Sequence, residues 1–206
     1  MSKKLKAPAA FGGKGVAAAI LAGGKSVRMG QPKALLLYND KPLIEHLIDR
    51  LKTNVQQLFI VGCPEPGLYR NVSARVIPDE SEALGPLGGM LSALHYVNED
   101  IAYLLIVPCD GIALPRLFVS RMVRALERQQ ADVVYARDAS REQHLYCLLK
   151  VELEASLREY IKPGGRKVID WFHLQHYAVE DFSADHFVFS NLNTLDDWQQ
   201  FLSESH

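Results

Sequence analysis

The chain has 206 residues, of which 48% are hydrophobic and 23% are charged, a composition that suits one globular α/β domain. Its 23 basic and 24 acidic residues give a formal net charge of -1, so no chain-wide basic footprint indicates a nucleic acid or a membrane surface as partner. No apolar run approaches the roughly 20 residues of a transmembrane helix, and three cysteines without metal-type spacing argue against a disulfide framework. We therefore expect a soluble, cytoplasmic protein.

The N-terminal stretch MSKKLKAPAAFGGKG differs from the rest of the chain because it is rich in lysine and glycine. It lacks the continuous apolar segment of roughly 7–15 residues that a secretory signal needs. No internal repeat or linker rich in Pro, Gly or Ser divides the remaining sequence. We predict a flexible basic tail over 1–15 and a single domain over 16–206.

Short apolar strands alternate with amphipathic helices along this domain. The expected elements are a strand at 16–22, a loop at 23–30, a helix with Pro42 at its first position and an apolar stripe through Leu51, strands at 57–62 and 74–79, a helix at 88–96, a strand at 101–110, a helix at 115–130, and strands at 131–136 and 145–150. Such alternation is typical of a mostly parallel sheet with helices on both faces, a three-layer α/β/α domain.

The loop after the first strand is the first candidate site, because ligands of open parallel sheets bind beyond the carboxyl ends of the strands. It reads LAGGKSVRMGQPKALL (21–36). Gly23 and Gly24 allow backbone amides to approach a ligand, and Arg28 and Lys33 add the cations that a polyphosphate requires. The spacing matches neither a Walker loop nor G-x-G-x-x-G, so a glycine-rich turn with solvated charges is the alternative.

Two further segments place carboxylates at the same kind of position. VPCD (107–110) ends an apolar strand with Asp110, whose desolvation must be compensated; Mg²⁺ opposite a phosphate would do so, and a helix N-cap is the alternative role. PDESEALGPLGGMLSAL (78–94) places Asp79 after a strand and a glycine-rich stretch before a helix, with a surface loop as the alternative.

Together, L-A-G-G-x-S-x-R-M-G-x-x-K, G-P-L-G-G-M and P-C-D resemble the nucleotidyltransferases with a Rossmann-like GT-A fold. More closely, the chain resembles the molybdenum cofactor guanylyltransferases, the MobA family, from about Val16 to Trp198. GGRKVIDWF (164–172) and FSNLNT (189–194) are similar to that family's basic helix start and N-x-N-T signature. The resemblance implies transfer of GMP from GTP to molybdopterin, with release of pyrophosphate and formation of the guanine dinucleotide cofactor.

The resemblance also implies roles for the matching residues. The nucleotide would contact Leu21, Ala22, Gly23, Gly24, Lys33, Asp79 and Asp110. Lys33, Asp110 and Arg28 would act in catalysis, and Asp110 would hold Mg²⁺. The pterin side would comprise Arg166, Lys167, His144, Asn191 and Asn193, of which Asn191 is also a candidate metal ligand. For Arg166 and Lys167, the alternative is a helix whose first turn carries solvated basic residues. GTP and molybdopterin are the implied substrates and molybdoenzyme maturation proteins the candidate partners; the sequence leaves the oligomeric state open, with a monomer favoured.

Two positions depart from the family pattern. Val61 and Gly62 stand where the family often has an asparagine, so nucleotide contacts there would use the backbone. His144 lacks the proline that follows it in the family, and it is either a donor to the cofactor or a strand residue. Gly23 favours GTP, since the CTP-using relatives tend to carry L-A-A-G. The alternatives are a molybdopterin cytidylyltransferase, another small nucleotidyltransferase, and a nucleotide-binding maturation adaptor without turnover.

Overall fold

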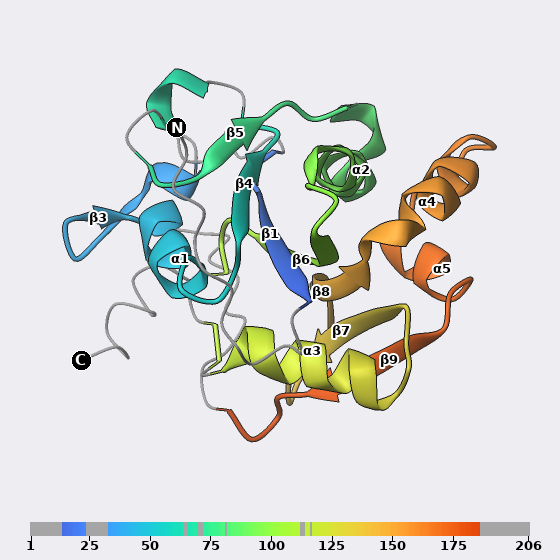
Figure 1. Ribbon diagram of the computed structural model, residues 1–206. Coiled ribbons are helices and arrows are strands. Elements are labelled where there is room, and N and C mark those ends of the chain that lie inside the picture. The colour runs from blue at the N-terminus through green and yellow to red at the C-terminus, as the bar shows by residue number, and fades with distance from the viewer. Residues whose placement is uncertain are drawn as a thin grey trace.

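A seven-stranded sheet with helices on both faces forms the body of the molecule (Figure 1). This computed structural model describes residues 14–23, 33–63, 66–69, 72–80, 82–111, 114–115 and 117–185. The architecture confirms the expected three-layer α/β fold with a mostly parallel sheet. Within the described ranges, no helix has the length and apolar character needed to span a membrane.

All strands of the large sheet except one have their carboxyl ends at the same edge of the sheet. The strands of the large sheet are β1 (Gly15–Leu21), β4 (Gln57–Val61), β5 (Arg75–Ile77), β6 (Ile101–Pro108), β7 (Val133–Arg137), β8 (Glu142–Lys150) and β9 (Tyr177–Asp181). Their order is β5-β4-β1-β6-β8-β7-β9. Only β8 runs antiparallel to its neighbours, β6 and β7, and the other pairings are parallel. Every other strand of this sheet therefore ends at the edge where β8 begins, which we call the carboxyl edge.

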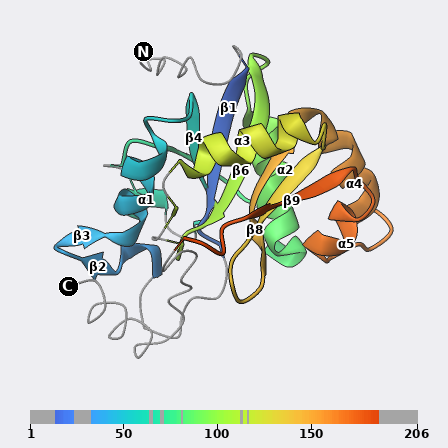
Figure 2. The same cartoon turned by 90° about the horizontal axis from the view of Figure 1, so that it is seen from below.

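Helices divide between the two faces and give each face its own apolar core. The helices are α1 (Leu43–Leu51), α2 (Pro86–Tyr96), α3 (Phe118–Arg128), α4 (Glu154–Ile161) and α5 (Val168–Phe172). One core contains residues of α1 and α3, and the other contains residues of α2, α4 and α5. Figure 2, which looks onto the first of these faces, shows α3 lying across the strands.

Strand β1 contributes small side chains to both cores. Ala17 and Ala19 belong to the core under α2, whereas Ala18 and Ile20 belong to the core under α1 and α3. All of them are fully buried. Alternation between the two faces follows from the two-residue period of a strand, and alanine lets the covering helices approach the sheet closely.

Short elements complete the described chain. A two-stranded hairpin and four 3-10 helices connect the larger elements: β2 (Leu37–Tyr38), β3 (Lys41–Pro42), η3 (Lys33–Leu35), η4 (Pro66–Tyr69), η5 (Glu82–Leu84) and η6 (Val151–Leu153). The predicted strands and helices are all present, with shifted ends. Pro42 is the N-cap of α1 and not its first helical residue. Helix α3 begins at Phe118 instead of 115, because Leu117 adopts a left-handed conformation (φ 58°).

The segment after β9 is anchored to α3 by Arg121. Its guanidinium donates hydrogen bonds to Glu180 (3.1 Å), to Asp185 (2.7 Å) and to the backbone oxygen of Asp181 (2.6 Å). It also lies over the Phe182 ring, 3.8 Å from the centroid. A planar guanidinium can satisfy several acceptors while stacking on a ring, so this one side chain fixes the direction in which the chain leaves the carboxyl edge.

Candidate functional site

Backbone hydrogen bonds hold the residues that follow β1 against both neighbouring strands. The amide of Ala22 donates to the Val61 oxygen at 2.9 Å, and the amide of Cys109 donates to the Leu21 oxygen at 3.0 Å. The pairing thus continues past the last regular strand residue on each side. As a result, Leu21 to Gly23, the end of β4 and the end of β6 lie side by side at the carboxyl edge, as the sequence predicted.

Two glycines approach each other closely at this edge. A Cβ at Gly23 would lie 3.1 Å from the Gly62 oxygen, and a Cβ at Gly62 would lie 3.2 Å from the Gly23 Cα. Gly62 also has φ +73°, a conformation that favours glycine. The Asp79 Oδ2 is 3.3 Å from that same Gly62 Cβ position. The sheet therefore presents bare backbone at this point, with the Asp79 carboxylate beside it.

Helix α2 packs against the same group of residues. A Cβ at Gly89 would lie 2.8 Å from Leu21 Cδ2 and 3.9 Å from Asp79 Oδ2, so a glycine permits this close packing. The buried Ser92 hydroxyl accepts a hydrogen bond from the backbone amide of Glu80 at 2.5 Å. Helix α2 therefore fixes the Asp79–Glu80 segment through the backbone.

Asp110 lies at the end of β6, half-buried. The next residue, Gly111, packs against Tyr146: a Cβ there would be 2.1 Å from the Tyr146 hydroxyl oxygen. Burial, and to a lesser extent the charge of Asp110, raises the pKa of Tyr146 well above its usual range. The phenol therefore stays neutral beside the carboxylate.

The acidic groups at the carboxyl edge suit a metal that is shared with a substrate. Within the described residues, His, Cys, Asp and Glu form no cluster of three or more that could enclose a metal ion. Mg²⁺ is usually held by one or two carboxylates together with substrate phosphates and water. A single carboxylate such as Asp110 at the open end of a strand fits that pattern and does not fit a structural metal site.

The cysteines near this edge are packing residues. Cys63 and Cys109 are 9% and 8% exposed. Burial raises the pKa of the Cys63 thiol, and it raises the pKa of the neighbouring Tyr69 to about 12. A thiol that stays protonated is a poor nucleophile, which agrees with a packing role for Cys63.

Several candidate residues lie outside the part of the chain that the structure describes. These are Gly24, Arg28, Asn191 and Asn193, together with most of the predicted basic tail. Lys33 begins η3, so its backbone is placed at the start of that turn, whereas its side chain is also outside the description.

Helix α4 carries the chain back to the carboxyl edge on the α2 side of the sheet. At its start, Glu154 lies 3.8 Å from His95, near the end of α2. One turn later, Arg158 binds Glu80 at 2.9 Å, and Glu80 follows Asp79. Helix α4 thus runs antiparallel to α2, and the loop 162–167 that follows it lies toward the carboxyl edge.

This loop contains the two predicted pterin-side cations. Both Arg166 and Lys167 are exposed and precede α5, which begins only at Val168 and has five residues. The sequence suggested that they belong to a helix start, and Lys167 is indeed the N-cap of α5, whereas Gly164 (φ +109°) and the packing of Gly165 against Tyr160 keep Arg166 in the loop before it. The Tyr160 hydroxyl donates to the Lys167 oxygen at 3.0 Å. The Arg166 guanidinium donates to the Gly165 oxygen at 2.7 Å. The loop backbone is therefore held, and both cationic residues remain exposed.

His144 lies near the start of β8, and hence near the carboxyl edge. Its Nε2 is 3.0 Å from the Glu142 carboxylate, and its ring meets Tyr135 edge-on with centroids 5.0 Å apart. The two contacts fix the orientation of the imidazole. His144 is thus a residue of strand β8, and its role as a donor to the cofactor stays a prediction.

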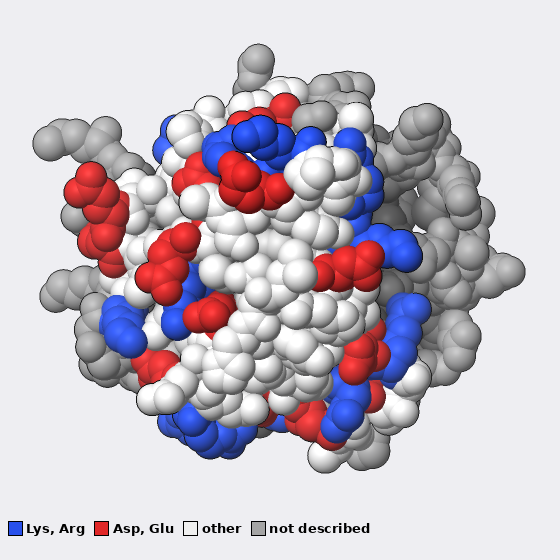
Figure 3. Space-filling view, turned by 90° about the vertical axis from the view of Figure 1, so that its right-hand side faces the viewer, with Lys and Arg blue, Asp and Glu red and all other residues white. Residues whose placement is uncertain are grey.

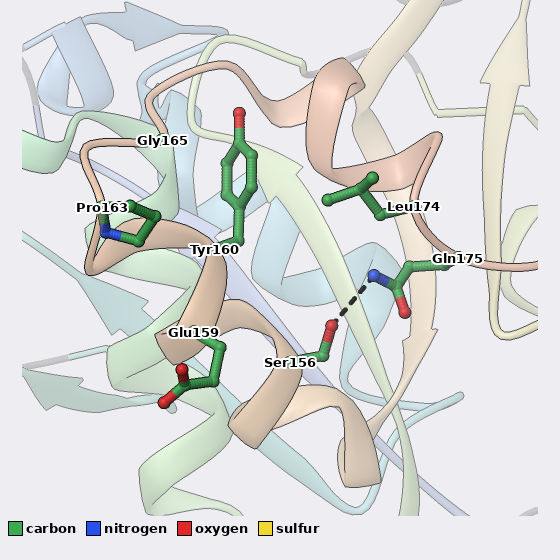
Figure 4. Close-up of a pocket in the computed structure, with 7 residues that line it drawn as sticks. All are labelled: Ser156, Glu159, Tyr160, Pro163, Gly165, Leu174 and Gln175. Carbon is green, nitrogen blue, oxygen red and sulfur yellow. Dashed lines mark hydrogen bonds between the residues drawn. The ribbon is translucent and has the colours of Figure 1, made fainter.

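A pocket of about 490 Å³ lies between α4 and α5 (Figure 4). Figure 3 faces this side of the molecule and shows a largely uncharged surface with acidic and basic side chains around it. The pocket extends to Leu174 and Gln175, just before β9 begins at the opposite edge of the sheet. Neither Asp79 nor Asp110 lines it. Its lining residues are Ser156, Glu159, Tyr160, Pro163, Gly165, Leu174 and Gln175.

Three residues that support the site were not predicted from the sequence: Ser92, Tyr146 and Arg158. Ser92 is a polar residue inside an otherwise apolar helix, which is a signal that could have been used. Tyr146 and Arg158 act through partners distant in sequence, Gly111 and Glu80, and a single sequence contains no sign of such pairs.

Comparison with known proteins identifies relatives. The model of the MobA-like NTP transferase domain matches residues 18–179. The molybdenum cofactor guanylyltransferase of Shewanella putrefaciens is 42% identical over 186 residues, 89% of this chain and 94% of that protein. The structure of molybdopterin-guanine dinucleotide biosynthesis protein A from Archaeoglobus fulgidus has a TM-score of 0.76 at 19% identity, covering 92% of this chain and 98% of that one. A manganese complex of a Mycobacterium tuberculosis protein has a TM-score of 0.67 at 18% identity, covering 92% and 98%. These structural matches show the fold.

We predict that Gly111→Ala destabilises the protein, because the new methyl group would overlap the Tyr146 ring. Overpacking of this kind costs roughly 1–3 kcal/mol, which urea unfolding would measure. The same change in a Tyr146→Leu background should cost clearly less, since leucine does not extend to the position of the phenol oxygen. Equal costs in both backgrounds would show that Tyr146 does not constrain the residue after Asp110.

Proposed function

The chain belongs to the MobA-like NTP transferase family, and on this basis we propose that it is a molybdenum cofactor guanylyltransferase. It transfers GMP from GTP to molybdopterin, forms the guanine dinucleotide cofactor and releases pyrophosphate. The observation that carries the proposal is the meeting of bare glycine backbone with Asp79 and Asp110 at one sheet edge. This arrangement occurs in a chain that is 42% identical to a guanylyltransferase over most of its length.

The nucleotide is proposed to lie over the ends of β1, β4 and β5. Leu21, Ala22, Gly23 and Gly24 supply backbone, and the absence of a Cβ at Gly23 and Gly62 permits close approach. Asp79 lies directly beside this surface, where a carboxylate can accept hydrogen bonds from the donor groups of a nucleoside. Support for this placement is the rule that ligands bind beyond the carboxyl ends of parallel strands.

The proposed reaction is an in-line displacement at phosphorus. A terminal phosphate oxygen of molybdopterin forms a bond to the α-phosphorus of GTP, while the bond from that phosphorus to the bridging oxygen breaks and pyrophosphate leaves. Such a transfer depends on positioning and charge stabilisation and requires no protein nucleophile. Lys33 and Arg28 are the residues proposed to stabilise charge on the phosphates.

Asp110 is the proposed ligand of Mg²⁺, with Asn191 as a second candidate. The ion would neutralise charge on the phosphates when bound. Asp110 suits it because a single, half-buried carboxylate after β6 leaves the remaining positions for phosphate oxygens and water. Tyr146, by packing on Gly111, limits the movement of the backbone that carries this carboxylate.

Molybdopterin is proposed to lie on the side of the loop 162–167. Arg166 and Lys167 expose two cations there, which suits the molybdopterin phosphate; His144, Asn191 and Asn193 complete the proposed pterin side. The same proposal includes molybdoenzyme maturation proteins as partners, a cytoplasmic location and a monomeric state.

The central test is a single-turnover assay with molybdopterin, Mg²⁺ and either GTP, CTP or ATP. We expect dinucleotide product with GTP and a preference over the other nucleotides on the order of 10² or more, because a site that pairs with one base leaves buried groups unpaired with another. Equal or better turnover with CTP would make the protein a cytidylyltransferase. Nucleotide binding without product would favour the maturation adaptor.

Asp110→Asn should reduce the single-turnover rate by ~10²-fold or more, the usual effect of removing an electrostatic stabiliser. Asparagine keeps the shape of the side chain and removes its charge. The control is Asp40→Asn in the exposed turn between β2 and β3, where φ of 59° also suits asparagine. Full activity of Asp110→Asn at limiting Mg²⁺ would refute the assignment.

Replacement of Arg166 and Lys167 by alanine should weaken molybdopterin binding roughly tenfold or more and leave GTP binding unchanged, since hydrogen bonds to charged groups contribute about 1.5–3 kcal/mol. Separate titrations with the two substrates measure this difference. Lys162→Ala is the control, because this exposed lysine lies in the same loop. Weaker GTP binding with unchanged molybdopterin binding would mean that the loop serves the nucleotide.

A further inference from the structure

One ion pair connects the two substrate sides of the molecule. Arg158 on α4 donates through Nη1 to Glu80 Oε1 at 2.9 Å. Glu80 directly follows Asp79, and the residues belong to segments 78 positions apart in the chain. Arg158 therefore connects the helix that leads to the pterin-side loop with the segment that carries the nucleotide-side carboxylate.

Both ends of this ion pair are held by additional contacts. Arg158 also donates to Glu154 through Nε (3.1 Å) and Nη2 (2.8 Å), which fixes the plane of its guanidinium. Glu80 is fixed by its backbone amide, which donates to Ser92 on α2. Because the arginine is already oriented by its own helix, little side-chain entropy remains to be lost when it binds Glu80.

We propose that Arg158 is a positioning residue for nucleotide binding, which acts through Glu80 to hold the Asp79 carboxylate beside Gly62. This inference rests on the proposed function, which assigns Asp79 to the nucleotide. Helix α2 restrains the segment through the Ser92 hydroxyl, which accepts from the Glu80 amide, and through the close packing of Gly89 near Asp79. Arg158 adds a side-chain contact from α4. Asp79 is thereby restrained from two helices.

Because the ion pair lies on the surface, its effect on nucleotide binding can be distinguished from an effect on stability. The side chains of Arg158 and Glu80 are 41% and 42% exposed, and ion pairs of this kind contribute little to the free energy of unfolding. A small change in the position of Asp79 would nevertheless change its contacts with a bound nucleotide. Loss of the pair should therefore appear in GTP affinity and not in thermal stability.

The experiment compares Arg158→Met, Glu80→Gln, the double variant and Glu154→Gln with the wild-type protein. Arg158→Met keeps much of the apolar stem and removes the charge. Glu154→Gln is the matched control, because it removes the partner of Arg158 within α4 and leaves Glu80 in place. For each protein, KM for GTP, kcat and Tm are measured in the GTP assay with molybdopterin and Mg²⁺.

We expect KM for GTP to rise about three- to tenfold in both single variants, with kcat and Tm nearly unchanged. The double variant should be no worse than either single variant, because both remove the same contact. Glu154→Gln should raise KM clearly less than Arg158→Met does, because the amide oxygen can still accept from the guanidinium and the contact with Glu80 stays in place. An unchanged KM in Arg158→Met overturns the proposal, as does an equal rise in Glu154→Gln, which would place the effect of Arg158 within α4. If the wild-type protein forms no product with GTP, the proposed function fails instead.

Discussion

The pairing of β1 with strands on both of its sides is the constraint on which the candidate site depends. Its hydrogen bonds continue past the regular strand, through Ala22 to β4 and through Leu21 to β6. Because backbone groups buried between two strands cannot be left unpaired without a large cost, these ends cannot move independently. Backbone pairing alone thereby brings the glycines after β1 and β4 and the carboxylate after β6 to one edge of the sheet.

The sequence predicted those parts of the fold whose apolar pattern is strong. Helix α1 buries Leu43, Ile44, Leu47, Ile48 and Leu51, all of which belong to the expected stripe. Helix α4 was not expected, because Leu157 is its one buried residue and eight residues give little periodicity. Strand β9 was missed for a similar reason: Ala178 is its one buried residue, and its place in the sheet comes from pairing with β7 and from Arg121.

The candidate site was predictable where it follows strand ends and was not predictable where it depends on contacts between distant segments. Asp110 was singled out because a carboxylate that ends an apolar strand must be compensated, and Asp79 because it matches an aspartate of the family. The parallel topology then brings both to the same edge. The contact of Gly111 with Tyr146 and the ion pair of Arg158 with Glu80 link segments far apart in the chain. Nothing in the local pattern of either segment indicates its partner.

If the nucleotide lies where we propose, the departure at the end of β4 changes how a base can be recognised there. Val61 and Gly62 offer no polar side chain, and the amides of Ala22 and Gly62 already donate to Val61 and Ile77 within the sheet. Recognition on this side must then use the remaining backbone groups, whose positions are set by strand register, together with side chains such as Asp79 that are held from the helices. In this placement, a change of nucleotide preference would require a movement of backbone or of the Asp79–Glu80 segment, and a Cβ at Gly23, which would lie 3.1 Å from the Gly62 oxygen, is one change that would cause such a movement.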